Sequence, residues 1–185
     1  MKNALILHGT ASSSKSNWFP WLKGKLEEKG WKVWVPDLPE AVTPNIKRYN
    51  EFLLSQPWDF NDESVIIGHS SGSVEILGLL QALPEGTQIK EAVLVGSFVS
   101  NLGRPDLAGL FEEEFNYEKI KTRAKKFTLI HSDDDPFCPL AGARALSEVL
   151  GGELIVQEGQ KHFSIGTAGE QYKEFPFILD LLDKN

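Results

Sequence analysis

The chain has 185 residues, of which 41% are hydrophobic and 24% charged, and its formal net charge is −7. This length favours one folded domain, and we expect that domain to span residues 1–185. The acidic balance argues against a broad electrostatic affinity for nucleic acid or anionic membranes. A single cysteine, Cys138, excludes an internal disulfide bond and a multi-thiolate zinc site.

No targeting or membrane segment stands out in the sequence. A secretory signal needs an apolar core of about 7–15 residues, whereas the apolar run that starts at Ala4 ends at Leu7. No stretch approaches the roughly 20 apolar residues of a membrane helix. We therefore expect a cytoplasmic protein with no membrane or nucleic-acid partner.

Short apolar runs alternate along the chain with segments of helical periodicity. Each apolar run is expected to form a buried strand, and the runs are residues 4–7, 31–35, 65–67, 92–95, 127–130 and 154–156. Apolar residues at helical spacing predict helices from about residues 18, 44, 73 and 141, and a last helix near 171–182. We expect Ser16 or Asn17 to cap the first helix, and the basic residues 119–126 to form a solvated helix end.

Six buried strands separated by helices predict the fold class. They indicate an α/β protein with three layers, α/β/α, around a six-stranded parallel sheet. Ligands of open sheets of this kind bind beyond the carboxyl ends of the strands. The segments that follow the strands are therefore the places to search for chemistry.

A Gly-x-Ser-x-Gly pattern follows the third expected strand, at residues 68–72. Small residues on both sides of the serine allow a sharp turn from strand to helix, which raises the Oγ atom of Ser70 above the sheet. The pattern alone is common, but the apolar run before it and the helical spacing after it are the context that a nucleophile requires. The alternative is a turn that merely joins strand to helix.

A serine nucleophile needs a base, and the chain has four histidines. His162 lies in the loop after the sixth expected strand, from which it can approach Ser70 across the carboxyl edge of the sheet. His69 adjoins Ser70, but adjacent side chains diverge, so we expect it to point away. The other two, His8 and His131, follow the first strand and end the fifth. The alternative for His162 is a solvated loop histidine.

Three consecutive aspartates, residues 133–135, follow the fifth expected strand. An imidazole base needs a carboxylate to fix its tautomer and stabilise its charged form. We choose Asp135, because residues 135–139 fit the Asp-x-x-(small apolar)-Pro context in which this acid is frequent, and Asp134 is the alternative. The spacing of the cluster gives little support for a metal site.

The chemistry also needs N–H donors for the oxyanion and a pocket for the acyl group. We expect one donor to be the backbone N–H of Ser71, at the helix start, and the other that of Thr10, after the first strand. Trp18, Phe98 and Phe111 are candidates for the acyl pocket. For Trp18, core packing is the more common role of an aromatic residue at helical spacing.

Taken together, these residues resemble the α/β-hydrolase superfamily. Residues 7–9, Leu-His-Gly, are similar to its oxyanion loop, residues 68–72 match its nucleophile elbow, and the chain order of serine, aspartate and histidine is the same. More narrowly, His-Gly followed by residues 17–22 resembles the small serine-hydrolase family that includes a retinoblastoma-binding human member and short bacterial proteins. The resemblance implies a reduced fold with six parallel strands and no large cap domain.

The same resemblance implies a function. It implies a serine hydrolase that acts on small acyl esters or related carboxyl derivatives through a Ser-His-Asp triad and an acyl-enzyme intermediate, with no cofactor or metal. The Leu-x-Cys-x-Glu motif that binds the retinoblastoma protein is absent, since Cys138 is followed by Pro139 and then by Leu140 in place of the glutamate, so that partner is not carried over. Two alternatives stay open: a non-catalytic protein-interaction module on the same scaffold, and an acyltransferase with the same triad.

Overall fold

The structure, a computed structural model, describes residues 1–184. Within these residues, six parallel strands form one sheet in the order β2-β1-β3-β4-β5-β6. The strands are β1 (Asn3–Leu7), β2 (Lys32–Trp34), β3 (Ser64–His69), β4 (Ile89–Val95), β5 (Ala124–Ser132) and β6 (Glu153–Gln157). The predicted six-stranded parallel sheet is therefore confirmed.

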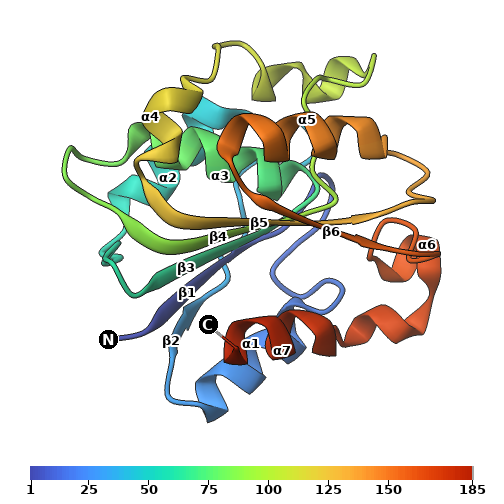
Figure 1. Ribbon diagram of the computed structural model, residues 1–185, viewed down its shortest axis with the longest axis horizontal. Helices are drawn as coiled ribbons and strands as arrows, with labels where there is room; N and C mark the ends of the chain where they lie inside the picture. Colours follow the sequence, from blue (N-terminus) through green and yellow to red (C-terminus); the bar gives the residue numbers. More distant parts are fainter. Residues whose placement is uncertain (185) are drawn as a thin grey trace.

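Helices cover both faces of the sheet, which gives the three predicted layers (Figure 1). One face carries α2 (Ile46–Ser55), α3 (Ser71–Ala82), α4 (Tyr117–Lys121) and α5 (Leu140–Leu150), and the other carries α1 (Phe19–Glu28) and α7 (Pro176–Asp183). The shorter pieces are η1 (Pro105–Leu110), α6 (Ile165–Ala168) and η2 (Glu170–Lys173). No helix in the described part of the chain has both the length and the apolar character that crossing a bilayer requires.

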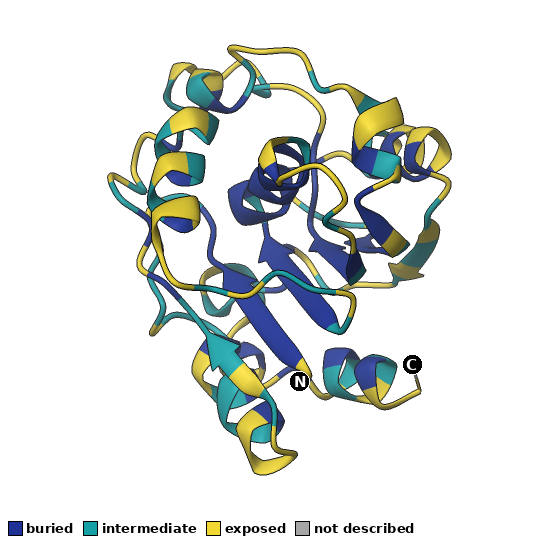
Figure 2. Cartoon of the chain, turned by 90° about the vertical axis from the view of Figure 1, so that its left-hand side faces the viewer, coloured by how far each residue is buried: buried dark blue, intermediate teal, exposed yellow. Residues whose placement is uncertain are grey.

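Successive residues of a strand point to opposite faces of the sheet, so each face has its own core. Along β1, Leu5 and Leu7 belong to the apolar cluster under α2, α3 and α5, whereas Ala4 and Ile6 belong to the cluster under α1 and α7. Figure 2 shows the central strands in the buried class, while the outer helices bury only one side. Helix α3 is buried along residues 71–80, so the element that follows Ser70 is anchored in the core.

The strand order creates a topological switch point between β1 and β3. From β1 the chain passes to β2 on one side, and it then returns to β3 on the other side of β1. Connections that leave neighbouring strands in opposite directions open a crevice beyond their carboxyl ends. Residues 8–10 follow β1 and Ser70 follows β3, so the expected oxyanion loop and the expected nucleophile flank this crevice.

The C-terminal region differs from the helix predicted over residues 171–182. The structure has the short 3₁₀ helix η2, then α7, which begins at Pro176. A proline lacks the N–H of a helix interior and disfavours helical backbone at the residue before it, and Phe175 accordingly has φ −142°. The amphipathic pattern is correct for α7, and Pro176 marks its start rather than its interior.

The basic segment 119–126 is also not a continuous helix end. Helix α4 ends at Lys121 and β5 begins at Ala124, so Lys126 lies in the sheet opposite Glu91 of β4. The Nζ atom of Lys126 is 3.3 Å from Oε1 of the buried Glu91. This cross-strand ion pair favours the strand, because opposite charges on paired residues stabilise a sheet.

Helix α1 is not capped by Ser16 or Asn17. Its N-cap residue is Trp18, which makes no side-chain cap hydrogen bond. The Oδ1 atom of Asn17 instead accepts a hydrogen bond from the N–H of Ile165, at 3.0 Å. The Oγ atom of Ser16 accepts a hydrogen bond of 3.1 Å from the N–H of Ser13. Both side chains therefore bond to loops, and that of Asn17 ties the segment before α1 to the start of α6.

Candidate active site

Ser70 occupies the turn between β3 and α3 with an unusual backbone conformation. Its φ is 56° and its ψ −124°, a combination that costs a non-glycine residue about 1–3 kcal/mol. Its N–H donates a hydrogen bond of 2.8 Å to the carbonyl oxygen of Val95 in the neighbouring strand β4. The turn is thus held from both sides by buried elements, which is how such a conformation persists.

Glycines around Ser70 permit a close approach of three backbone segments. A Cβ atom at Gly68 would lie 2.3 Å from the carbonyl oxygen of Gly72, and one at Gly72 would lie 2.4 Å from that of Leu7. A Cβ atom at Gly9 would lie 2.9 Å from the Cβ of Ser70. The exits of β1 and β3 and the start of α3 therefore touch one another, as the sharp strand-to-helix turn predicted at residues 68–72 requires.

His162 and Asp135 meet at the carboxyl edge of the sheet. The Nδ1 atom of His162 is 2.7 Å from Oδ2 of Asp135, and their side chains are 8% and 0% exposed. The other oxygen, Oδ1, accepts hydrogen bonds from the N–H groups of Phe137, at 2.9 Å, and Cys138, at 3.0 Å. A carboxylate at Nδ1 favours the tautomer that leaves Nε2 able to accept a proton.

The pKa of Asp135 lies below its ordinary value. Burial raises this pKa, but the hydrogen bond and the charge of His162, together with the N–H groups of Cys138 and Phe137, lower it by more. Asp135 is therefore ionised at neutral pH, which is the state that can orient an imidazole.

Asp134, the alternative acid, bonds to the loops rather than to His162. Its Oδ1 accepts hydrogen bonds from Ser132 Oγ, at 2.7 Å, and from the N–H of Lys161, at 2.8 Å. Its Oδ2 is 2.7 Å from Nζ of Lys161. The side-chain bond of Lys161, followed by the bonds from Ser132 and the Lys161 N–H, lowers the pKa of Asp134 to about 2. Asp134 thus joins the loop after β5 to the loop that carries His162.

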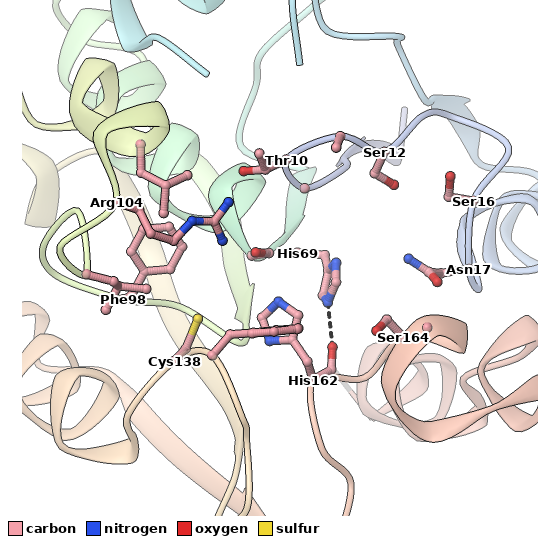
Figure 3. Close-up of a pocket in the computed structure, with 17 residues that line it drawn as sticks. Thr10, Ser12, Ser16, Asn17, His69, Phe98, Arg104, Cys138, His162 and Ser164 are labelled. Carbon is pink, nitrogen blue, oxygen red and sulfur yellow. Dashed lines mark hydrogen bonds between the residues drawn. The ribbon is translucent and has the colours of Figure 1, made fainter. Parts of the chain in front are cut away.

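His69 lies against His162 instead of pointing away from the site. The two ring centroids are 4.8 Å apart, and Nε2 of His69 is 2.8 Å from the carbonyl oxygen of His162, as the dashed line in Figure 3 marks. Because a carbonyl oxygen only accepts, Nε2 carries the proton. Burial, followed by the neighbouring His162, lowers the pKa of His69 to about 3, so the ring is neutral at neutral pH. No local sequence pattern indicates this contact, which joins residues 93 positions apart.

The loop after β1 is fixed beside the start of α3. The Oγ1 atom of Thr10 donates a hydrogen bond of 3.0 Å to Oγ of Ser71. His8 braces the loop, because its Nδ1–H donates to the carbonyl oxygen of Gly9 and its Nε2 accepts from the N–H of Leu38, both at 2.9 Å. The first N–H groups of a helix have no carbonyl partner within it. The hydrogen bond places Thr10 beside Ser71, the first residue of α3, and the role of their N–H groups as oxyanion donors stays a prediction.

A cavity of about 430 Å³ opens at this edge, and both Ser70 and His162 line it. Two walls of different chemistry enclose it (Figure 3). One wall is largely apolar with a single cation, and consists of Phe98, Leu102, Arg104 and Leu107. The other offers hydroxyl and amide groups from Ser12, Ser16, Asn17 and Ser164. The size is in the range of small-molecule sites.

Of the three aromatic residues suggested for an acyl pocket, Phe98 lines the cavity and the other two do not. Trp18 is fully buried in the core, where its Nε1–H donates a hydrogen bond of 3.1 Å to the carbonyl oxygen of Phe163. Phe111 packs behind Phe98, with 5.9 Å between ring centroids. The buried position of Trp18 agrees with core packing, the more common role of an aromatic residue at helical spacing, since such spacing identifies an inward face without telling a core from a cavity.

Asp135, Cys138 and His162 bring their ligand-type atoms within 4.8 Å of one another, and within residues 1–184 this is the one cluster with the donors for a metal ion. A thiol binds metal as the thiolate, and burial raises the pKa of Cys138. Asp135 and His162 are already bonded to each other. The donor set therefore fits an acid–histidine pair beside a small packing residue better than a closed metal site.

Several lining residues are not predicted from the sequence, among them Phe137, Ser164 and Arg104. Phe137 is 52% exposed and sets its ring edge-on to His162, with 5.2 Å between centroids. Ser164 follows His162 by two positions. Of these three, only Arg104 stands out in the sequence, because it is the single basic residue among residues 97–118.

Comparison with known proteins points to one family. The sequence model of the family described as serine hydrolase matches residues 4–184. YdeN of Bacillus subtilis (strain 168) is 26% identical over 182 residues, which cover 98% of this chain and 94% of YdeN. Serine hydrolase RBBP9 of Rattus norvegicus is 24% identical over 159 residues, which cover 84% of this chain and 83% of RBBP9.

Solved structures share the fold. The crystal structure of the ydeN gene product of B. subtilis has a TM-score of 0.91 at 25% identity, covering 100% of this chain and 98% of that one. An extracellular alpha/beta-hydrolase from a Paenibacillus species has a TM-score of 0.71 at 15% identity, covering 100% and 98%. The expected α/β-hydrolase fold is thereby confirmed, and residues 1–184 contain no large cap domain.

Proposed function

This chain belongs to the serine hydrolase family and is a hydrolase, and we propose that it cleaves small acyl esters or related carboxyl derivatives through Ser70, His162 and Asp135. Ser70 is the nucleophile, His162 the general base, and Asp135 the carboxylate that orients the imidazole and stabilises its charged form. One observation carries the proposal: His162, whose Nδ1 is 2.7 Å from Oδ2 of Asp135, lines the same cavity as Ser70.

The reaction proceeds in two steps. In the first, Oγ of Ser70 bonds to the acyl carbon while His162 takes its proton, and His162 then gives that proton to the departing alcohol, which leaves a serine ester. In the second, His162 takes a proton from water, the water oxygen attacks the ester, and the carboxylic acid departs as Ser70 regains its proton. The N–H groups of Ser71 and Thr10 stabilise the oxyanion in both steps, and such a donor typically contributes about 3–4 kcal/mol.

The neutrality of His69 supports this assignment of roles. His162 must become positively charged when it takes the proton, and a second cation at van der Waals distance would oppose that charge. His69 lies 4.8 Å from His162 between ring centroids, and its pKa of about 3 keeps it uncharged. His69 is thus a positioning residue, which holds the carbonyl of His162 without competing for the proton.

Esters of graded chain length test the proposal. We expect the wild-type protein to hydrolyse p-nitrophenyl acetate, butyrate and octanoate with an initial burst of p-nitrophenol, because the acyl-enzyme forms before it is hydrolysed. Ser70→Ala should lose the burst and turnover, while Ser55→Ala, at the exposed end of α2, serves as the matched control. Equal turnover by wild type and Ser70→Ala would refute the assignment.

Two further outcomes separate the alternatives. If acylated products of an added alcohol or thiol exceed the free acid, the chain is an acyltransferase with the same acyl-enzyme. If the wild-type protein turns over no ester or thioester of the panel, a non-catalytic interaction module is supported instead. Product analysis by mass spectrometry distinguishes these cases.

A further inference from the structure

Arg104 is the one basic side chain of residues 1–184 that lines the cavity, apart from the histidines, and no aspartate or glutamate lines it. The positive charge of Arg104 contrasts with the acidic character of the chain and of the segment that carries it. The chain carries a net charge of −7, and the segment 97–118 contains five acidic residues but only this arginine. An anionic group that enters this cavity would therefore meet a cation and no lining carboxylate, although the protein as a whole is acidic.

The guanidinium of Arg104 is held on one edge. Its Nη2 is 2.5 Å from Oδ2 of Asp106 and its Nε is 3.3 Å from Oδ1 of the same residue. This two-point contact uses the Nε–Nη2 edge, and Nη1 has no hydrogen-bond partner within residues 1–184. Asp106 does not line the cavity. A planar guanidinium that is fixed on one edge presents its remaining donors in a defined orientation.

The side chain of Arg104 points into the cavity (Figure 3). Figure 3 shows the guanidinium of Arg104 reaching from the side of Phe98 toward Thr10 and His69, into the middle of the cavity. Leu102 and Leu107 line the same wall. An acyl chain that packs on these apolar side chains would carry a group at its far end to the arginine.

We propose that Arg104 selects substrates with a second, free carboxylate, such as monoesters of short dicarboxylic acids. This inference rests on the proposed function, and it names the substrate class. A carboxylate can be bound by one guanidinium edge through two parallel hydrogen bonds, and Asp106 occupies only the Nε–Nη2 edge of Arg104. The opposite wall offers Ser12, Ser16, Asn17 and Ser164, which are neutral, so the anion belongs at the Arg104 end.

A pair of esters matched in length tests the selection. Monophenyl glutarate carries the free carboxylate, and its methyl ester does not. We expect Arg104→Gln to lower the ratio of kcat/KM for the anionic ester to that for the neutral ester by about tenfold, since a hydrogen bond to a charged group is lost at a half-exposed site. The loss in Arg104→Gln should appear as a higher KM for the anionic ester. The preference of the wild type for the anionic ester should decrease as NaCl is added. Arg104→Lys should keep part of the preference.

The matched control is Arg144→Gln, which removes the same charge from an exposed position of α5 outside the cavity lining. It should leave the ratio of the two esters as in the wild type. Rates are corrected for spontaneous hydrolysis, and melting temperatures verify that each variant is folded.

Calorimetry with glutarate separates this inference from the proposed function. If glutarate binding weakens about tenfold in Arg104→Gln, the anion site stands, even if neither ester is hydrolysed and the proposed ester cleavage fails. If both esters are hydrolysed but the ratio and the glutarate affinity are the same in wild type and Arg104→Gln, the inference is overturned. A loss of equal size for both esters, with unchanged glutarate affinity, also overturns it, because Arg104 would then serve the reaction rather than select the substrate.

Discussion

Two regions beside the cavity, the carboxyl edge of the sheet and the segment 97–118, are built differently. On the sheet side, Ser70 is held in a strained conformation between buried strands, and His162 and Asp135 are nearly enclosed. On the other side, the segment 97–118 contains the short helix η1 and the first residues of α4, and half of its residues are exposed, Arg104 among them. Bond-making groups must be held within fractions of an ångström, whereas a group that selects substrates tolerates more freedom. Changes on the sheet side should therefore cost orders of magnitude, and changes on the segment side should cost about tenfold.

The sharpest contrast lies within the sheet side, between two adjacent aspartates. Asp135→Asn should lower kcat by about 10⁴-fold, because an amide at Nδ1 of His162 favours the wrong tautomer. Asp134→Asn should cost less than about tenfold, because it only weakens bonds between two loops. Steady-state kinetics with one activated ester measures both. A larger loss in Asp134→Asn would mean that Asp134 is the acid.

Stability should also distinguish tightly packed positions from open ones. Gly72→Ala adds a Cβ that would lie 2.4 Å from a carbonyl oxygen of β1, so we expect the free energy of unfolding to fall by about 3 kcal/mol. Gly24→Ala, in α1, meets no atom within 4 Å and should raise it by about 0.5–1 kcal/mol. Urea denaturation followed by circular dichroism measures both changes. Equal effects would show that the elbow is less tightly packed than its contacts imply.

Glu75, in the same tightly packed region, is a buried carboxyl group whose ionised form is destabilised. It is fully buried in α3, both of its carboxylate oxygens lack a hydrogen-bond partner within residues 1–184, and burial raises its pKa well above the ordinary value. The folded protein therefore keeps a proton that the unfolded chain releases at lower pH. As a result, the free energy of unfolding is unaffected below the ordinary glutamate pKa and falls as the pH rises from there toward the raised pKa.

Glu75→Gln removes this titration while it conserves the shape of the side chain. At pH 8 the variant should be more stable than the wild type by about 1–3 kcal/mol, and the difference should diminish toward pH 4. Melting temperatures across this pH range provide the measurement. A wild type whose stability relative to the variant does not change with pH would contradict the raised pKa.

The sequence was sufficient to predict the sheet and the edge at which the candidate site lies. Continuous apolar runs identified buried strands, and parallel strands end at one edge, so Ser70, Asp135 and His162 were expected together. Periodicity does not tell which strands are neighbours, so the switch point between β1 and β3 was not predicted. The contact of His69 with the carbonyl of His162 and the position of Arg104 depend on how distant loops meet, which no local pattern encodes.

Identifying the serine that reacts tests the proposed triad at its nucleophile. After treatment with a fluorophosphonate probe, peptide mapping by mass spectrometry should locate a single adduct on Ser70, and Ser70→Ala should remain unlabelled although folded. Ser12, Ser16 and Ser164 line the same cavity and are the natural competitors. An adduct on one of these serines, or undiminished labelling of Ser70→Ala, would show that Ser70 is not the nucleophile.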